Sequence, residues 1–466
     1  MRYLYIVSFL FVSFALSAQG INFQRTFELE TRDMLHGSMS VAADGSFFLI
    51  NLFEDPMEND LKKFHVTKHA AKGDLMWAFD YQLQNVSESI NFDMDILATD
   101  DRGAVFTVIA KQITTGPDIR YVVKLSSAGV VEWSQELGGE DGAAANIDNV
   151  EIITSFTSGY ILGSDSDDSI SDDNFTGQYL SSIDQEGQIN WSKGYVVEDT
   201  LMDGDTILQP IESTRFSSVT RSVFDFTMVT CGVNFNGDGN YGFISKIDPD
   251  GNLLWSKSYQ FIDSLVVNPT LNICDVAVGP DGTIAMAGSI DLASEGFFQP
   301  FIVKVDTIGE VVWSEGLKFG GNLPVARHTQ VTIDNVGGIV VSGRYLEGFV
   351  PFDYMSRYSS TGDLLWTQSF PRINSYLQDP MFGGYLKGGE LQSLGDGYMF
   401  SANAINFASE EGYPFVVRTN EAGEAQCEQS VITESDSLNI VADTLKWLSQ
   451  DYLFNERCRH KSAYNY

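Results

Sequence analysis

The sequence predicts an all-β fold, a β-propeller of seven four-stranded blades, on the strength of three observations. The phrase Gly-x-x-x-Trp recurs along most of the chain, and a second turn signal falls between successive copies. The residues that follow an N-terminal apolar stretch also resemble the strand after each phrase. Units of this length with four strands are typical of propeller blades.

The Gly-x-x-x-Trp phrase occurs six times, with successive Trp residues 56, 58, 64, 58 and 53 positions apart. A degenerate seventh copy ends at Cys427, 61 positions after the last of them. Five positions before the Gly, six of the seven copies carry Lys or Arg. Each copy therefore predicts a strand, a glycine turn and a second strand. The Trp residues of the repeat are Trp77, Trp133, Trp191, Trp255, Trp313 and Trp366.

A second hairpin is predicted in the first half of most units, and only the fourth unit, over 217–231, lacks a clear glycine turn. The turn glycines are Gly45, Gly103, Gly159, Gly282, Gly338 and Gly397.

The ring is expected to close through the N-terminus. The segment that begins at Asn22-Phe23 resembles the segment that begins at Asn190-Trp191, but no strands of its own unit precede it. We expect this segment to complete the last blade and so to protect its edge. Eight or six blades are the alternatives.

Three segments are expected along the chain. Residues 1–18 predict a cleaved signal peptide, with Arg2 before an apolar run and small residues up to Ala18. The run is too short for a comfortable membrane span, so we expect a secreted or cell-surface protein without a transmembrane segment. Residues 19–427 form the predicted propeller. Residues 428–466 form a C-terminal extension, interpreted either as a strand-forming segment clipped to Cys427 by a disulfide or as a truncated linker.

Charge and cysteine content restrict the partners. The chain has 63 acidic and 28 basic residues, a net charge of −35, which argues against nucleic-acid binding. Its four cysteines allow three disulfide pairings, and none of them forms a C-x-x-C pair that would favour zinc or redox chemistry. We expect a monomer whose partner is an extracellular protein or glycan, and no cofactor other than a calcium ion. The cysteines are Cys231, Cys274, Cys427 and Cys458.

The recurring side chains are interpreted as structural. Each indole would pack between its own blade and the next, because a regular ladder suits a repeated interface better than a single ligand site. The recurring Lys and Arg residues would pair with acidic neighbours such as Asp248 or Asp306.

The segment from Lys246 to Tyr259, with the phrase Asp-Gly-Asn-Leu-Leu-Trp, resembles the repeat of secreted bacterial propellers whose longer members often end in a type IX sorting domain. It is also similar to the tryptophan-docking repeat of quinoprotein (PQQ-like) propellers. The resemblance covers about residues 22–427 and implies architecture; such propellers serve as adhesive modules, scaffolds and enzymes. Quinoprotein activity is not expected, because no two cysteines are adjacent and no calcium ligand set for the quinone is recognisable.

Two loops suggest calcium, which prefers six to eight oxygen ligands. One holds five Asp residues within nine positions but lacks the usual turn glycine, so a solvated loop is the competing interpretation. The other, Asn234–Asn240, begins like a calcium loop but has Ser245 where the closing acid should stand, which favours a Gly/Asn-rich turn. The five acidic candidates are Asp165, Asp167, Asp168, Asp172 and Asp173.

Low-specificity catalytic candidates lie near the predicted innermost strands. His36 and His328 occupy similar positions before their turn glycines, and Asp95 and Glu390 sit comparably in other blades. Such groups around a channel mouth could perform acid–base chemistry on a sugar. No nucleophile motif accompanies them, so the leading expectation is a non-catalytic binding or scaffold propeller. The alternative is a carbohydrate-active enzyme, a lyase or hydrolase, with its site at the channel mouth.

Overall fold

A computed structural model describes most of the repeat and parts of the tail. The described residues are 22–26, 34–55, 61–81, 92–110, 119–137, 150–154, 159–167, 176–200, 208–210, 213–236, 239–262, 270–292, 297–319, 326–347, 350–371, 390–406, 411–425, 429–430, 433–437, 440–444 and 446–451. Over these residues the secondary structure consists of strands and turns, and no helix is long and apolar enough to cross a membrane. The predicted signal peptide lies outside them.

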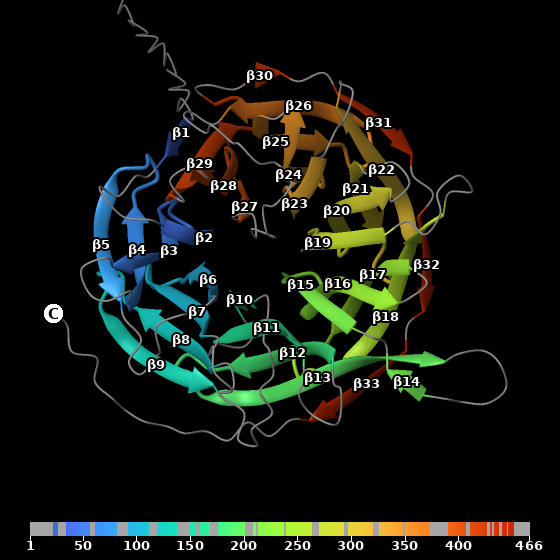
Figure 1. Cartoon of the computed structure of the whole chain (residues 1–466), viewed down its shortest axis with the longest axis horizontal. Helices are drawn as coiled ribbons and strands as arrows, with labels where there is room; N and C mark the ends of the chain where they lie inside the picture. The colour runs from blue at the N-terminus through green and yellow to red at the C-terminus, as the bar shows by residue number, and fades with distance from the viewer. Residues whose placement is uncertain are drawn as a thin grey trace, which may run out of the picture.

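Seven antiparallel sheets follow one another around a central axis, which confirms the seven-bladed propeller (Figure 1). From the axis outward, blade 1 consists of β2 (Met34–Val41), β3 (Phe47–Asp55), β4 (Leu61–His69) and β5 (Leu75–Tyr81). Blade 2 consists of β6 (Phe92–Ala98), β7 (Ala104–Ala110), β8 (Ile119–Leu125) and β9 (Val131–Leu137). Blade 3 consists of β10 (Val150–Thr154), β11 (Tyr160–Asp167), β12 (Thr176–Ile183) and β13 (Ile189–Thr200), to which β14 (Leu208–Pro210) pairs.

The next three blades repeat this order. Blade 4 consists of β15 (Ser213–Ser222), β16 (Thr227–Asn236), β17 (Gly239–Ile247) and β18 (Leu253–Phe261). Blade 5 consists of β19 (Thr270–Val278), β20 (Ile284–Leu292), β21 (Phe297–Val305) and β22 (Val311–Phe319). Blade 6 consists of β23 (Ala326–Ile333), β24 (Ile339–Glu347), β25 (Val350–Tyr358) and β26 (Leu364–Pro371).

Blade 7 closes the ring in the predicted way. Its own strands are β27 (Leu391–Leu394), β28 (Gly397–Asn406) and β29 (Glu411–Asn420), and the N-terminal β1 (Phe23–Thr26) supplies the outer strand. In the antiparallel register of β1 with β29, Phe23 lies opposite Arg418. The Phe23 side chain is 3% exposed and packs beside Phe47 of blade 1, with ring centroids 6.2 Å apart.

The C-terminal tail runs backward around the outside of the disc, as Figure 1 shows in red. Its strands β30 (Gln429–Ser430), β31 (Thr433–Ser437), β32 (Ile440–Thr444) and β33 (Lys446–Asp451) pair with the fourth strands of blades 6, 5, 4 and 3 in turn, as the fifth strand of the sheet in blades 6, 5 and 4 and as the sixth in blade 3. The last residue of each tail strand lies opposite the residue two positions after the blade's Trp. These pairs are Ser430 with Gln368, Ser437 with Glu315, Thr444 with Lys257 and Asp451 with Lys193.

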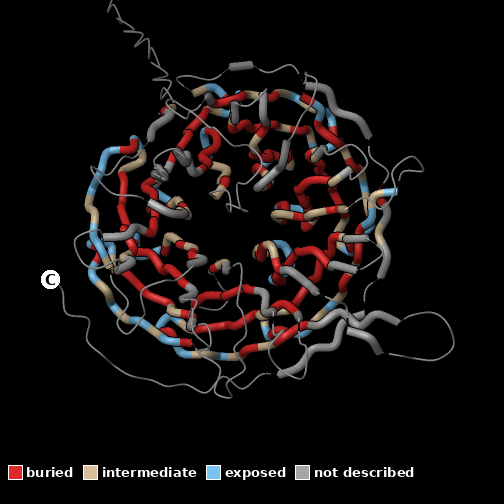
Figure 2. The backbone as a smooth tube through the Cα atoms, in the orientation of Figure 1, coloured by how far each residue is buried: buried red, intermediate tan, exposed pale blue. Residues whose placement is uncertain are grey.

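The core is divided among the blade interfaces. Seven apolar clusters occur in the described residues, and each combines side chains from two neighbouring blades. The middle strands are the most deeply buried parts of the blades, while the outer strands carry the exposed residues (Figure 2). The hydrophobic effect therefore stabilises the contacts between blades, and the fold depends on the closed ring.

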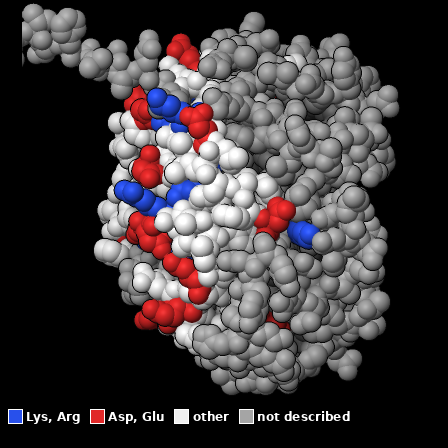
Figure 3. All heavy atoms as spheres, turned by 90° about the vertical axis from the view of Figure 1, so that its left-hand side faces the viewer, with Lys and Arg blue, Asp and Glu red and all other residues white. Residues whose placement is uncertain are grey.

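The first and third strands of a blade run parallel, so the tight turns that follow them lie on one face of the disc. Many of the connections at the opposite face lie outside the described residues. Seen from the side of β5 and β9, acidic and basic side chains of the described surface are interspersed rather than separated (Figure 3).

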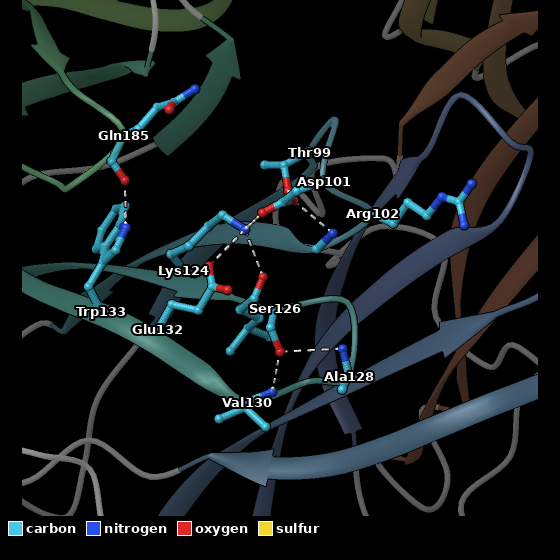
Figure 4. A network of polar contacts seen from close by, with 12 residues as sticks. Thr99, Asp101, Arg102, Lys124, Ser126, Ala128, Val130, Glu132, Trp133 and Gln185 are labelled. Atoms are coloured by element: carbon cyan, nitrogen blue, oxygen red, sulfur yellow. Dashed lines mark hydrogen bonds and ion pairs between the residues drawn. The ribbon is translucent and has the colours of Figure 1, made fainter.

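Each of the recurring Trp side chains contacts the turn of the following blade. The Trp133 indole nitrogen donates to the Gln185 carbonyl at 2.7 Å, as Figure 4 shows, and the Trp191 indole nitrogen donates to the Pro249 carbonyl at 3.0 Å. Gly251 of that second turn has a φ of 77°, and a Cβ there would come within 3.0 Å of the Trp191 ring. The turn needs glycine for both its backbone conformation and the close approach of the indole.

The recurring basic side chains tie each hairpin to its own blade or to the next. Lys124 binds Asp101 at 2.6 Å and Glu132 at 3.3 Å (Figure 4), and Lys246 binds Asp225 at 2.5 Å. The expected partners Asp248 and Asp306 were wrong. The Asp248 carboxylate instead accepts backbone N–H bonds within its own turn, and Asp306 does the same in the next blade. Adjacency in sequence misled this prediction, because Asp101 and Asp225 lie in the preceding hairpin of the sheet and Glu132 lies on the strand paired with that of Lys124.

Candidate functional site

One polar side chain from each inner strand, or from the residue just before it, contributes to a ring around the axis. We call this set the axial ring. The members share a local pattern, since each stands immediately before an apolar residue that is buried. Four members are carboxylic acids. The ring consists of Ser38, Asp95, Glu151, Ser218, Asp275, Gln330 and Glu390.

Three of the carboxyl groups link neighbouring blades. Asp95 accepts a hydrogen bond from the Ser38 hydroxyl of blade 1 at 2.5 Å and from the Ile152 amide of blade 3 at 2.9 Å. Glu151 accepts the Val219 amide of blade 4 at 2.7 Å. Asp275 joins its neighbouring blades through hydrogen bonds of the same kind.

Asp275 of blade 5 accepts the Ser218 hydroxyl at 2.6 Å and the Val331 amide of blade 6 at 2.8 Å. Asp275 therefore connects blades 4, 5 and 6 in the same way as Asp95 connects blades 1, 2 and 3. A charged acceptor forms stronger hydrogen bonds than a neutral one, so these carboxylates stabilise the inner strands against one another.

Glu390 differs from the other three acids. Its Oε1 accepts a hydrogen bond from the Gln392 side chain at 3.0 Å, whereas its Oε2 is inaccessible to solvent and has no partner among the described residues. Burial raises the pKa of Glu390 well above its ordinary value of 4.5, and the negative charge of Asp95 raises it further. Glu151 and Asp275 act in the same direction more weakly. The axis therefore holds one carboxyl group whose pKa is raised, near three other carboxyl groups.

This shift predicts how stability depends on pH. Because the pKa of Glu390 is higher in the folded chain than in the unfolded chain, protonation of this group stabilises the fold. This contribution to the free energy of unfolding is fully present below pH 4.5 and is lost as pH rises through the folded pKa. We expect Glu390→Gln to match the wild type in melting temperature near pH 4 and to exceed it at pH 8. Calorimetry of both proteins across this range measures the difference. A difference that stays constant with pH would show that Glu390 is not held neutral.

The structure brings together two of the four catalytic candidates. Asp95 and Glu390 are both members of the axial ring and interact electrostatically. His36 is the extra residue of a bulge in β2, and His328 lies in β23, so both belong to inner strands. The side chains of the two histidines lie outside the described residues.

Sequence reasoning missed Glu151 and Asp275. The signal was present, because ring residues stand seven or eight positions before the turn glycine of their blade, as Asp95 does before Gly103. Blade 4 has no such glycine, and the count varies between seven and eight in the other blades. The offset could have identified the set, but only an observed register shows that the side chains meet.

Neither calcium candidate gains support from the structure. Asp165 and Asp167 lie on β11 opposite Gln178 and Thr176, while Asp168, Asp172 and Asp173 lie outside the described residues. Asn236 pairs with Gly239 at the end of a hairpin, in keeping with a tight turn. Among the residues that the structure does describe, no group of three or more His, Cys, Asp or Glu side chains is arranged to hold a metal ion. Cys231 is buried and Cys274 is half-buried, and no disulfide joins these two residues, while Cys427 and Cys458 are not among the described residues.

No protein-family model matches the chain, and no curated protein matches it in sequence. Solved structures with a similar fold include the polysaccharide lyase Uly1, at 10% identity and a TM-score of 0.50, over 88% of this chain and 94% of that one. An α-L-arabinanase from Penicillium chrysogenum has 8% identity and a TM-score of 0.43, over 86% and 98%. An α-L-arabinofuranosidase from Fusarium graminearum has 9% identity and a TM-score of 0.45, over 86% and 97%.

The likeness to Uly1 shows the fold, over 88% of this chain and 94% of that one. It also corrects the leading expectation from sequence, a non-catalytic binding or scaffold propeller, because the similar structure is a polysaccharide lyase, which favours the alternative. The sequence led to the wrong choice because propeller active sites are assembled from separate blades, so they leave no contiguous motif.

Proposed function

We propose that this protein is a carbohydrate-active enzyme that cleaves glycosidic bonds at the propeller axis. The observation that carries the proposal is the gathering of four carboxyl groups in the axial ring, one of which, Glu390, has a buried Oε2 atom and a raised pKa. Glycoside hydrolysis uses such a pair, in which one carboxylic acid protonates the leaving oxygen and a second carboxylate acts as base or nucleophile.

The two roles follow from the environments of the groups. Burial of its carboxyl group and nearby negative charge raise the pKa of Glu390, which suits the general acid. Asp95 exerts the strongest charge effect on Glu390 and is the carboxylate that we assign as its partner. Its bonds to Ser38 and Ile152 fix its position on both sides. An acid and a carboxylate held by different blades can act on a bond placed between them.

Export fits this proposal, because polysaccharides are extracellular substrates. We propose that residues 1–18 direct the chain out of the cytoplasm and that the mature protein begins after Ala18. N-terminal sequencing of protein recovered from the culture medium or cell surface tests this step, with Gln19 as the expected first residue.

The enzymatic proposal is tested by supplying purified full-length protein with a panel of neutral and uronate-containing polysaccharides. New reducing ends report any cleavage, and ultraviolet absorbance of unsaturated uronate distinguishes elimination from hydrolysis. We expect Glu390→Gln to lower the rate by about 100-fold or more, the usual contribution of a general acid. Glu186→Gln, in an exposed turn far from the axis, is the matched control and should keep full activity. Cleavage that persists at the full rate in Glu390→Gln would refute the assigned role.

A further inference from the structure

The turn between β15 and β16 of blade 4 presents two aromatic rings to solvent. Phe224 is 54% exposed and Phe226 is 63% exposed, the largest fractions among the aromatic side chains that the structure describes. Val223 in the same turn is exposed as well. Apolar side chains that gather at one place on a surface mark binding sites, unlike single scattered ones. We call Val223, Phe224 and Phe226 the blade 4 platform.

This composition distinguishes blade 4 from the rest of the repeat. The corresponding turns in blades 1, 2, 5, 6 and 7 contain no aromatic residue; they span 42–46, 99–103, 279–283, 334–338 and 395–396. The propeller therefore does not require aromatic side chains here, and those of blade 4 need another explanation.

The backbone of Phe226 supports the same conclusion. Its φ is 56°, in the left-handed region, where a bulky side chain is an outlier. The turns of blades 1, 5 and 6 place Gly45, Gly282 and Gly337 in this region. Strained residues of this kind are concentrated at binding and catalytic sites. Blade 4 therefore keeps an exposed ring at a position whose backbone conformation favours glycine.

Asp225, between the two rings, fixes the shape of the turn. Its carboxylate accepts the hydroxyl groups of Ser222 and Thr227, each at 2.7 Å. Its second oxygen lies 2.5 Å from the Lys246 ammonium nitrogen. A turn that is held in this way before a ligand arrives loses little conformational entropy on binding.

Phe224 also contacts the neighbouring blade. A Cβ added to Gly282 of blade 5 would lie 2.6 Å from the Phe224 ring, so the ring rests against that turn. A ring that served only to join blades 4 and 5 would be expected to bury its surface, as Tyr259 does in the core cluster of these blades. Phe224 instead leaves about half of its surface open to a ligand.

Size and charge restrict the ligand. Three side chains are far fewer than the roughly 20–30 residues that each side of a stable protein interface contributes. An aromatic ring matches the apolar face of a sugar ring, and sites for small ligands combine such rings with a few polar groups. The net charge of −35 disfavours a polyanionic chain. A neutral polysaccharide fits these conditions.

The platform is separate from the axial ring. Ser218 of the axial ring stands on β15, the innermost strand of blade 4 (Figure 1), five positions before Val223. At the usual rise of a strand this corresponds to about 15 Å. A ligand on the platform therefore need not touch the carboxyl groups at the axis.

We propose that the blade 4 platform is a second, non-catalytic binding site for a neutral polysaccharide, with Phe224 and Phe226 stacking against its sugar rings. The class of ligand rests on the proposed function, but the binding itself does not depend on the axial carboxyl groups. The platform holds the polymer beside the axis, so loss of a ring should raise KM for the polymer and leave kcat unchanged.

Affinity electrophoresis of the full-length protein through gels that contain β-glucan, xylan or arabinan tests the proposal. Phe226→Gly removes one ring and supplies the residue that the backbone favours, so it should melt within about 2 °C of the wild type. It should bind the retarding polymer about tenfold more weakly. Phe226→Tyr keeps a ring and should bind like the wild type. Val336→Ala, at an exposed apolar position in the corresponding turn of blade 6, is the matched control and should also bind like the wild type.

Several results would overturn this assignment. They are wild-type protein that none of the three gels retards, Phe226→Gly that is retarded as strongly as the wild type, or a melting temperature of Phe226→Gly more than about 5 °C lower, which would indicate a structural role for the ring. Sedimentation velocity adds another, a wild-type dimer that Phe226→Gly converts to a monomer, because the surface would then join two copies of the chain.

The proposed function fails in a different way. Retardation that depends on Phe226, without any new reducing ends, would support the platform and refute cleavage at the axis. Cleavage of a polymer with the same KM in the wild type and in Phe226→Gly would refute the platform and leave the enzymatic proposal in place.

Discussion

Trp191→Ala is expected to destabilise the protein by about 3–5 kcal/mol, the range for removing a large aromatic side chain from a packed interface. The indole donates a hydrogen bond to the Pro249 carbonyl at 3.0 Å and lies against Gly251 of the next blade. The Lys193 ammonium also lies 5.9 Å from the centre of its ring. Alanine removes all three contacts and leaves a gap between blades 3 and 4. Chemical denaturation followed by circular dichroism measures the loss.

Leu254→Ala is the control for this variant. Leu254 stands one position before the Trp of its blade and is 52% exposed, so its replacement should change stability by no more than about 0.5 kcal/mol. If Trp191→Ala were as mild as Leu254→Ala, the contact between indole and turn would not be what holds these blades together.

Phe23→Ala is expected to cost about 3–5 kcal/mol as well, although β1 contains only four residues. Phe23 is almost fully buried between the first and last blades, in a cluster with Met39, Phe47, Met399 and Val416. Its loss weakens the only strand that joins the start of the described chain to blade 7. Besides the fall in unfolding free energy, hydrogen exchange should accelerate in β29, the direct partner of β1, before it does in β25 of blade 6.

Val312→Ala, at a position that is 56% exposed on β22, provides the comparison. It should leave both stability and the exchange of β29 unchanged. Uniform acceleration across all blades in Phe23→Ala would argue that the ring has no preferred point of opening.

The architecture was accessible from the sequence because one contact repeats. The indole of each unit packs against a turn glycine of the next, so the motif Gly-x-x-x-Trp recurs every 53 to 64 residues. Phe23 could be recognised as the closing strand for the same reason, since it stands where a Trp stands in other units. The tail carries no such phrase. Its Trp447 has Asp443 rather than glycine four positions before it, so the repeated phrase does not mark the register of the tail strands.

The candidate site was accessible only in part. Asp95 and Glu390 could be proposed from their positions in the repeat, whereas Glu151 and Asp275 needed the observed pairing. A repeat fixes which strand a residue belongs to, but the bulges of the inner strands decide which side chains face one another across the axis. The raised pKa of Glu390 depends on that arrangement as well as on burial, so no local pattern could have indicated it.

The two ends of the described chain have a bearing on how this protein reaches its final form. Blade 7 needs residues from the very beginning of the repeat, and blades 4 to 6 acquire their outermost strands only from residues beyond position 428. A nascent chain that has emerged as far as blade 5 can form four-stranded sheets, but it lacks the β29 strand that pairs with β1 and the tail strands that pair with the outer strands. Completion therefore waits for the last segments to be synthesised, and a growing polypeptide remains an incomplete, opened arc until then.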